Sequence, residues 1–324
     1  APKTYKIAEH HLSLWTSPEL RTEEIRKMRN SNAEWDFMGR TFFALSLSNM
    51  ALRNPENKDT YLQIMDTIIE ETVRIEKEHG IYHFLMGYAR NAPFLSKSGR
   101  SIFLDGEIAL MIAARRLVEE KQEYIPILKE RIKIMIDQMK EGPVLCAESY
   151  PDECWMFCNS IAIAAIIASD TLDGTDHSRF ISDWLHTVKK KLVDKETRLL
   201  ISSFTRDGCH MDGPEGSSIW MISHCMKLID PEFAEDQYRR AKKELANKIL
   251  GFGYAKEWPE TWKGPCDIDS GPIIPIVQIS AGSSGMAFLG AATFNDQDFL
   301  SSLLTSLNYG GFPMEDKNGT RFMA

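Results

Sequence analysis

WDFMGRTFFALSLSNMAL, residues 35–52, is apolar on almost every side of a helix, whereas TYLQIMDTIIEETVRIEKEHG, residues 60–80, has one apolar stripe and one charged face. A helix that is apolar all round is enclosed by other elements, and a helix with a single apolar stripe lies on the outside. The two stretches therefore predict an inner helix followed by an outer helix.

The same alternation continues along the chain, because apolar residues recur every three and four positions in ten stretches. The predicted helices cover 33–53, 58–79, 102–119, 122–140, 152–170, 178–193, 215–228, 232–248, 281–292 and 296–307. Odd members are apolar or rich in small residues, and even members carry a charged face. These five pairs predict an all-α fold, an (α/α)6-type toroid of alternating inner and outer helices with long site-forming loops.

The toroid is expected to be a single domain over residues 1–324, which can itself be part of a longer chain. Its sixth pair would come from the N-terminal YKIAEHHLSLW and the C-terminal GTRFMA. Residues 198–212 and 251–275 interrupt the helical pattern with aromatic, β-branched, Gly and Pro residues. Long connections of this kind are usually functional, so we expect them to form loops or short hairpins near a site.

Composition excludes several classes of function. Of the 324 residues, 43% are apolar and 26% are charged, which is typical of a soluble globular protein. The net charge of −8 and the absence of a basic block longer than KKK at 189–191 argue against nucleic acid as a partner. No apolar run reaches the ~18 residues that span a bilayer. The first residue is not Met, so a leader or anchor can have preceded it, and membrane association would need such segments.

No cofactor or metal is expected. The six cysteines are too few for a disulfide scaffold, and none shows zinc-ligand spacing. The sequence also lacks a G-x-S-x-G elbow, a phosphate-binding loop and a dinucleotide fingerprint. Oligomeric state and compartment, cytoplasmic or periplasmic, stay open at this point.

Carboxylates stand at the start of every inner helix. They are Glu34 and Asp36, Asp105 and Glu107, Asp152 and Glu153, Asp212 and Glu215, and Asp267 and Asp269. One acid per helix is explained by capping and by the helix dipole, but two exceed that need. All inner helices of a toroid run the same way, so their starts would converge on one rim.

We therefore predict one cavity lined by Asp36, Asp105 or Glu107, Asp152 and Asp269. Crowded carboxylates cannot all ionise, so at least one should have a raised pKa and act as the acid. Asp105 or Glu107 is favoured for that role, with Asp269 next. Arg40, four residues after Asp36 on the same helical face, should keep Asp36 charged.

The cysteines add a second group of candidates. Cys154 and Cys158 are expected four residues apart on one helical face, with Cys146 in the preceding loop. A thiol near a helix N-terminus has its anion stabilised, so Cys146 and Cys158 would exchange protons near neutral pH, although free cysteines are usually small core residues. The loop before the seventh helix offers His210, which a cysteine would need as a partner for nucleophilic catalysis.

Several stretches together resemble the linalool dehydratase/isomerase family, a group of α/α toroids. They are AEWDFMGRTFFALSL (33–47), the cysteine-bearing run ending at Cys158 and Asn159, DGPEGSSIWM (212–221) with DPEFAEDQYRRAKKEL (230–245), and DIDSGPIIP (267–275) with SAGSSGMAFLGAA (280–292). The resemblance implies acid/base addition or removal of water on a small terpene alcohol. It matches Asp36 to a family aspartate, and Cys146 with Cys158 to a family cysteine pair.

Two positions depart from the family pattern. Phe42 stands where the family has a tyrosine six residues after the aspartate, and the third inner helix offers Asp105 and Glu107 in place of a histidine. The D-x-D of Asp267 and Asp269 resembles part of an acid motif of class II terpene cyclases.

These observations favour a lyase or isomerase that hydrates, dehydrates, isomerises or cyclises a mainly apolar, terpenoid-like molecule. Its catalytic residues would be Asp36, Asp105, Glu107, Cys146, Cys158 and Asp269. Its substrate-binding residues would be Arg40, Phe42, Phe43, Tyr150, Asp152, Trp155, Asn159, His210, Asp212, Glu215, Trp220 and Asp267. Aromatic walls would stabilise cationic character.

Two other hypotheses stay open. A carbohydrate-active hydrolase, lyase or epimerase would use two carboxylates across an open groove with Arg, Asn and Trp. A non-catalytic toroid that binds lipid or protein would have solvated rim carboxylates and no buried acid in the cavity.

Overall fold

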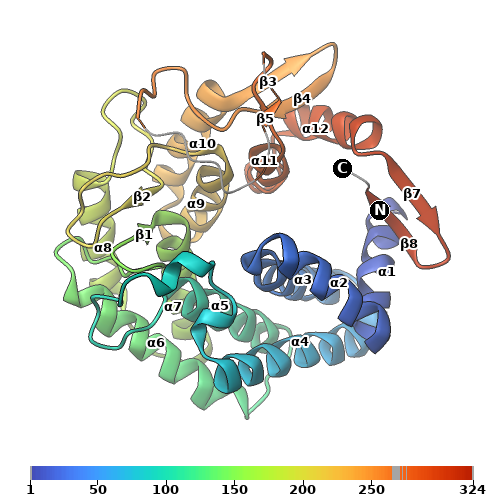
Figure 1. Ribbon diagram of the computed structural model, residues 1–324, viewed down its shortest axis with the longest axis horizontal. Helices are drawn as coiled ribbons and strands as arrows, with labels where there is room; N and C mark the ends of the chain where they lie inside the picture. The colour runs from blue at the N-terminus through green and yellow to red at the C-terminus, as the bar shows by residue number, and fades with distance from the viewer. Residues whose placement is uncertain (1, 265–270, 272, 275, 323–324) are drawn as a thin grey trace.

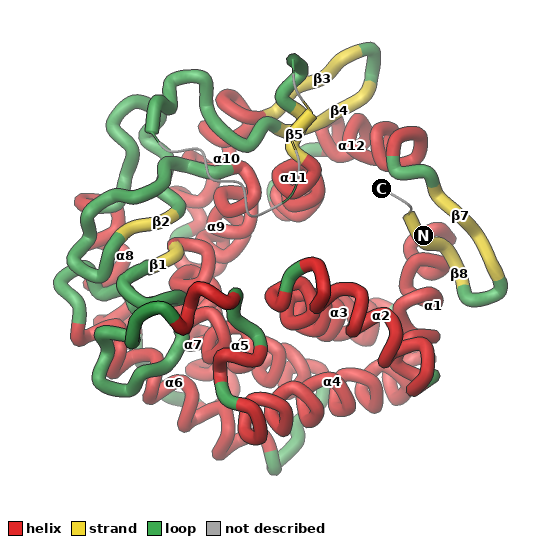
Figure 2. Tube along the Cα trace, viewed as in Figure 1, coloured by secondary structure: helices red, strands yellow, loops and turns green. Residues whose placement is uncertain are grey.

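Helices dominate the computed structural model, which describes residues 2–264, 271, 273–274 and 276–322 (Figures 1 and 2). The described α-helices are α1 Pro2–Thr16, α2 Pro18–Ser31, α3 Ala33–Arg53, α4 Lys58–His79, α5 Ile102–Val118, α6 Tyr124–Glu141, α7 Met156–Asp173, α8 Ser178–Lys191, α9 Gly216–Ile229, α10 Pro231–Leu245, α11 Ala281–Thr293 and α12 Gln297–Gly310. Short 3-10 turns are η1 Pro55–Asn57, η2 Ile81–His83 and η3 Gly87–Arg90.

The strands are short. They are β1 Cys154–Trp155, β2 Ser203–Phe204, β3 Ala246–Ile249, β4 Phe252–Ala255, β5 Ile273–Ile274, β6 Ile279–Ser280, β7 Pro313–Asp316 and β8 Gly319–Phe322. All pair antiparallel, as β1–β2, as a sheet in the order β3-β4-β6-β5, and as the hairpin β7–β8. The all-α prediction is confirmed by the helices, and the two predicted loop regions contain β2 and, in the second, β4 and β5, whereas β3 takes the place of the last residues of the predicted helix 232–248.

The predicted inner and outer helices are recognisable in the packing. The inner helices contact one another in the order α3, α5, α7, α9, α11, while α4, α6, α10 and α12 pack on their outside (Figure 1). Burial follows the sequence pattern, because α5 is buried almost all round whereas α4 buries one stripe. Small residues allow the closest inner contact, since a Cβ at Gly106 would already lie 3.5 Å from the Cβ of Ala162 on α7.

α7 is one of the most apolar helices of the ring. It is the described helix whose length and composition would suffice to cross a membrane, but 72% of it is buried inside the molecule. It thus forms the core of the protein, as the run IAIAAIIA predicts.

The predicted start of this helix is wrong. α7 begins at Met156, because Cys154 and Trp155 instead pair with Phe204 and Ser203. Asp152, with a φ of 54°, lies in the tight turn before this ladder. Cys154 and Cys158 consequently do not share a helical face.

The predicted sixth pair also needs correction. The N-terminal segment is helical, but GTRF forms β8, which packs against α1 as one strand of a hairpin (Figure 1). Gly319 has a φ of 118°, and a Cβ there would lie 2.2 Å from the carbonyl oxygen of Lys6. Only glycine fits both the backbone conformation and this approach. The ring is thus closed by α1, α2 and the hairpin.

Candidate active site

A cavity of about 390 Å³ lies where the inner helices begin. All five inner helices contribute to it from their N-terminal halves, so the prediction that their starts converge is confirmed. The lining residues are Glu34, Trp35, Met38, Gly39, Phe42, Tyr88, Phe103, Ser149, Tyr150, Trp155, Phe157, Cys158, Glu215, Ser217, Ser218, Ala281, Gly282, Gly285 and Met286.

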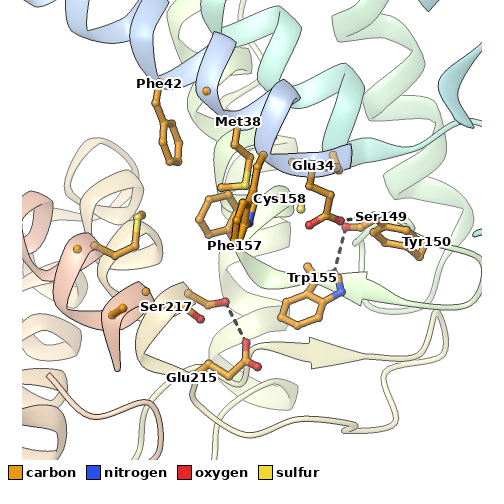
Figure 3. A pocket seen from close by; sticks show the side chains of 18 of the residues that line it. Glu34, Met38, Phe42, Ser149, Tyr150, Trp155, Phe157, Cys158, Glu215 and Ser217 are labelled. Atoms are coloured by element: carbon orange, nitrogen blue, oxygen red, sulfur yellow. Dashed lines mark hydrogen bonds between the residues drawn. The ribbon is translucent and has the colours of Figure 1, made fainter. Parts of the chain in front are cut away.

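Seven aromatic residues and two methionines make up about half of the lining residues. α3 turns Trp35, Met38 and Phe42 toward the cavity because they recur at helical spacing on one face, and Figure 3 shows Met38 and Phe42 one turn apart. Phe157 and Trp155 also line the cavity. Such a surface favours an apolar ligand with few polar groups.

One polar pair, Glu34 and Tyr150, interrupts the apolar wall (Figure 3). The Tyr150 hydroxyl donates a short hydrogen bond to the Glu34 carboxylate and accepts one from the Met86 N–H at 3.0 Å. Tyr88 stacks on the Tyr150 ring at 4.6 Å between centroids. Burial, with the nearby Glu34 charge, raises the pKa of Tyr150 above its usual value, so the phenol stays protonated and acts as a donor to Glu34.

Glu153 fixes the neighbouring indole. It accepts hydrogen bonds from the Trp155 indole N–H and, at 3.2 Å, from the Tyr88 hydroxyl. The two aromatic side chains are therefore held in place by one carboxylate, so this part of the wall is preorganised.

A second carboxylate, Glu215, lines the cavity at the N-cap position of α9. The Ser218 hydroxyl donates to it at 3.2 Å. Behind it, the buried Glu257 accepts from the Ser217 N–H at 2.9 Å, from the Ser217 hydroxyl at 2.6 Å and from the Ser280 hydroxyl. Because Ser280 caps α11, Glu257 holds the starts of α9 and α11 together.

The predicted ring of acids is wrong for Asp36, Asp105 and Asp152. Asp36 is buried on another face of α3, 2.7 Å from the Arg40 Nε and 3.2 Å from Arg29. The Arg40 partnership is thus confirmed. Asp105 is paired with Arg131 at 2.6 Å and with Arg100.

Asp152 accepts from the backbone N–H of Arg206 at 3.1 Å and does not line the cavity. A buried carboxylate needs a partner, and arginines from other elements supply it for Asp36 and Asp105. Asp267 and Asp269 lie outside the described residues.

Glu107 is the predicted acid that stands out. Its side chain is fully buried on α5 and is absent from the cavity lining. Burial raises its pKa to about 7, against a smaller lowering by the Thr41 hydroxyl. That hydroxyl donates to the Met38 carbonyl, so within the described residues neither Glu107 oxygen has a hydrogen bond of good geometry.

The cysteines lie in less polar surroundings than predicted. The five described ones are free thiols, and of these Cys158 alone lines the cavity. Burial raises the pKa of Cys146 to about 12 and that of Cys158 well above its usual value. Cys146 is fully buried away from the cavity, so its predicted place in the wall and its stabilised anion are wrong.

The predicted substrate-binding residues divide into two groups. Phe42, Tyr150, Trp155 and Glu215 line the cavity. The others are placed elsewhere. Arg40 and Phe43 line a second cavity, and the Asn159 side chain is hydrogen-bonded to the Ala147 backbone. The exposed His210 contacts the Lys191 carbonyl at 2.8 Å, Asp212 accepts a hydrogen bond from the Ser203 hydroxyl, and the Trp220 indole donates one to Ser283 at 3.1 Å.

Sequence reasoning did not select several cavity residues, including Glu34, Met38 and Tyr88. Glu34 belongs to the acidic helix start that drew attention to Asp36, and helical spacing from Phe42 leads back to Met38 and Glu34. Tyr88 lies in η3, outside the regular helices, and no pattern in the sequence indicates it.

The model of the linalool dehydratase/isomerase family matches residues 109–320, nearly two thirds of the sequence. The match includes α7, with Cys158, and the start of α9, with Glu215. Both elements form walls of the cavity described above. The chain belongs to the linalool dehydratase/isomerase family.

Proposed function

We propose that this cavity is the active site of a dehydratase or isomerase that acts on a small terpenoid allylic alcohol. The family is one of lyase and isomerase chemistry on terpenoids, and the cavity supplies what that chemistry requires. The observation that carries the proposal is the presence of two carboxylates, Glu34 and Glu215, on different elements around one aromatic-walled cavity.

The reaction needs one proton donor and one proton acceptor. A carboxyl group transfers its proton to the substrate hydroxyl oxygen, the C–O bond breaks, and water leaves. The carboxylate of the other residue accepts a proton from the carbon next to the allylic cation, which leaves a new C=C bond. For isomerisation, water instead adds to the other end of the cation and gives up its proton. Each route balances with protons alone, so the proposal includes no cofactor.

We assign the acceptor role to Glu34, because the Tyr150 phenol that donates to it is a stronger hydrogen-bond donor than the Ser218 alcohol that donates to Glu215, and therefore favours the ionised form of Glu34 more. Two ionised carboxylates at one apolar cavity would repel each other, so Glu215 is assigned the proton. Cys158 stays a neutral thiol in the wall. Glu107 holds a further proton near neutral pH, and we assign it no contact with substrate because it does not line the cavity.

The aromatic side chains suit a cationic intermediate. Trp35, Phe42, Trp155 and Phe157 line the cavity. The electron-rich face of such a ring attracts a cation by about 0.5 to 2 kcal/mol per contact. The same wall excludes bulk water, so that the water released in the first step is the one that can add to the cation.

The carbohydrate alternative fits this cavity less well. A sugar site needs polar side chains around the ligand, and the described lining contains neither arginine nor asparagine. A purely binding toroid is less favoured because two carboxylates, Glu34 and Glu215, line one cavity with an aromatic wall.

The decisive test is turnover of a ten-carbon tertiary allylic alcohol such as linalool, followed by gas chromatography of the dehydrated hydrocarbon, a triene, and of the primary alcohol. Glu34→Gln and Glu215→Gln keep side-chain shape but remove proton exchange. Each should lower kcat by about 10² to 10⁴-fold, the range usual for a general acid or base.

Glu130→Gln is the matched control, because Glu130 is exposed on the outer helix α6. It should leave turnover unchanged. Full activity in both cavity variants would refute the assignment of the two carboxylates.

A further inference from the structure

A second cavity, of about 450 Å³, lies between α1, α2 and α3. Its lining is largely apolar and includes Ile7, Leu14, Trp15, Ile25 and Met28. Its volume is within the range that binds small organic molecules. It therefore offers as much apolar space as the candidate active site.

The two cavities share part of their wall. Gly39 and Phe42 of α3 line both of them. The residue before Gly39, Met38, lines the first cavity, and the residue after Phe42, Phe43, lines the second, because they lie on different faces of α3. At Gly39 there is no side chain, so the Phe42 ring is the main side chain between the two spaces.

The charged groups of the second cavity are already neutralised by one another. Asp36 is paired with Arg40 at 2.7 Å, and Arg40 with Glu71 at 3.0 Å. Arg21 also reaches Glu71, at 3.3 Å, and both arginines lie over the Trp15 ring at 5.2 and 5.3 Å.

Glu24, the remaining acidic residue in the lining, is paired with Lys27 at 2.9 Å. An anionic headgroup would have to break such pairs, which is unfavourable in a partly buried site. The lining thus suits an uncharged, apolar chain.

We propose that Phe42 sets the accepted chain length, because its ring closes the first cavity, where the hydroxyl group reacts, against a second cavity that is a latent subsite for the distal isoprenoid units of longer alcohols. This inference rests on the proposed function. With Phe42 in place, a ten-carbon alcohol fills the first cavity alone. Removal of the ring joins the two spaces and roughly doubles the length of chain that can be buried.

Binding is measured with chain-saturated ten-carbon and fifteen-carbon isoprenoid alcohols, which cannot form the allylic cation, so that affinity is separated from chemistry. The readouts are titration calorimetry and tryptophan fluorescence. The wild-type protein should prefer the ten-carbon alcohol. Phe42→Ala should shift the ratio of the two dissociation constants toward the fifteen-carbon alcohol by at least about tenfold, because several methylene groups become buried.

Two further variants separate this effect from simple enlargement. Met286→Ala widens the first cavity alone and should leave the ratio near its wild-type value. Ser46 is an exposed residue of α3 that lines the second cavity, and Ser46→Trp in the Phe42→Ala background should reverse the shift by filling that cavity.

The outcomes are distinct. Binding of the ten-carbon alcohol with no change of ratio in Phe42→Ala would overturn the subsite and leave the proposed function standing. An equal shift in Met286→Ala would also overturn it, since any added volume would then have the same effect. Failure of the wild-type protein to bind either alcohol would overturn the proposed function, and the subsite with it.

Discussion

Glu107→Gln should change how the stability of the protein depends on pH. The pKa of Glu107 is about 7 in the folded protein, against a usual value of 4.5, because burial disfavours the charged form. Below about pH 4.5 the carboxyl is protonated in both the folded and the unfolded chain. Between pH 4.5 and 7 the unfolded chain ionises while the folded protein retains its proton. Stability therefore falls as pH rises through this window and levels off above it.

The size of the effect follows from the two pKa values. A pKa moved from 4.5 to about 7 corresponds to about 3 kcal/mol of unfolding free energy between the acidic and the alkaline limits. Glutamine has nearly the same shape and cannot ionise, so this contribution disappears from the variant. The variant should therefore gain about 3 kcal/mol relative to the wild-type protein on going from pH 4.5 to pH 8.

Urea unfolding followed by circular dichroism, at several pH values, measures this difference. The exposed Glu130→Gln variant corrects for the loss of an ordinary carboxyl group. Parallel pH profiles for the wild-type protein and Glu107→Gln would refute the reasoning, because they would show that Glu107 has the same affinity for protons in both states. Turnover of the same variant then reports whether the stored proton takes part in the reaction.

Three further variants test other features. Tyr150→Phe removes the hydrogen bond to Glu34 and should lower kcat at least about tenfold. KM should change little, because the ring stays in the cavity wall; steady-state kinetics measure both constants. Asn159→Leu leaves the buried Ala147 N–H and carbonyl unpaired and should lower the unfolding free energy by about 2 to 4 kcal/mol in urea titrations; an unchanged midpoint would contradict this. Glu257→Gln weakens the link between α9 and α11 and should lower the melting temperature by a few degrees in calorimetry. An unchanged melting temperature would contradict this role of Glu257.

The helices were predictable because the residues that a helix buries are apolar and recur every three or four positions in the sequence. α3 and α4 begin and end at the predicted residues, since an all-round apolar helix and a one-striped helix differ in every turn. The start of α7 was missed because Cys154 and Trp155 are held by Phe204 and Ser203, about fifty residues away. The spacing of apolar residues within one segment does not indicate a pairing partner that is distant in the sequence.

In the candidate site, too, features set by local sequence pattern were predictable and features set by distant partners were not. Convergence of the helix starts was predictable from their common direction, and Tyr150, Trp155 and Glu215 were named correctly as cavity residues. Asp36 and Asp105 were misplaced because their arginine partners come from α2, α6 and the loop before α5 as well as from their own helix. A carboxylate at a helix start looks the same in the sequence whether it faces a cavity or an arginine.

The packing of β8 on α1 has a consequence for how the molecule assembles. Most helix pairs in contact in the ring are neighbours along the chain or one helix apart, so their contacts can form early and locally. The Lys6–Glu315 ion pair instead joins segments 309 residues apart, at the place where the two ends of the described chain meet in Figure 1. A growing polypeptide can therefore build the helical pairs in order of synthesis, but it fastens the ring only after β8 has emerged. The junction between β8 and α1 is therefore the last contact of the described ring to form.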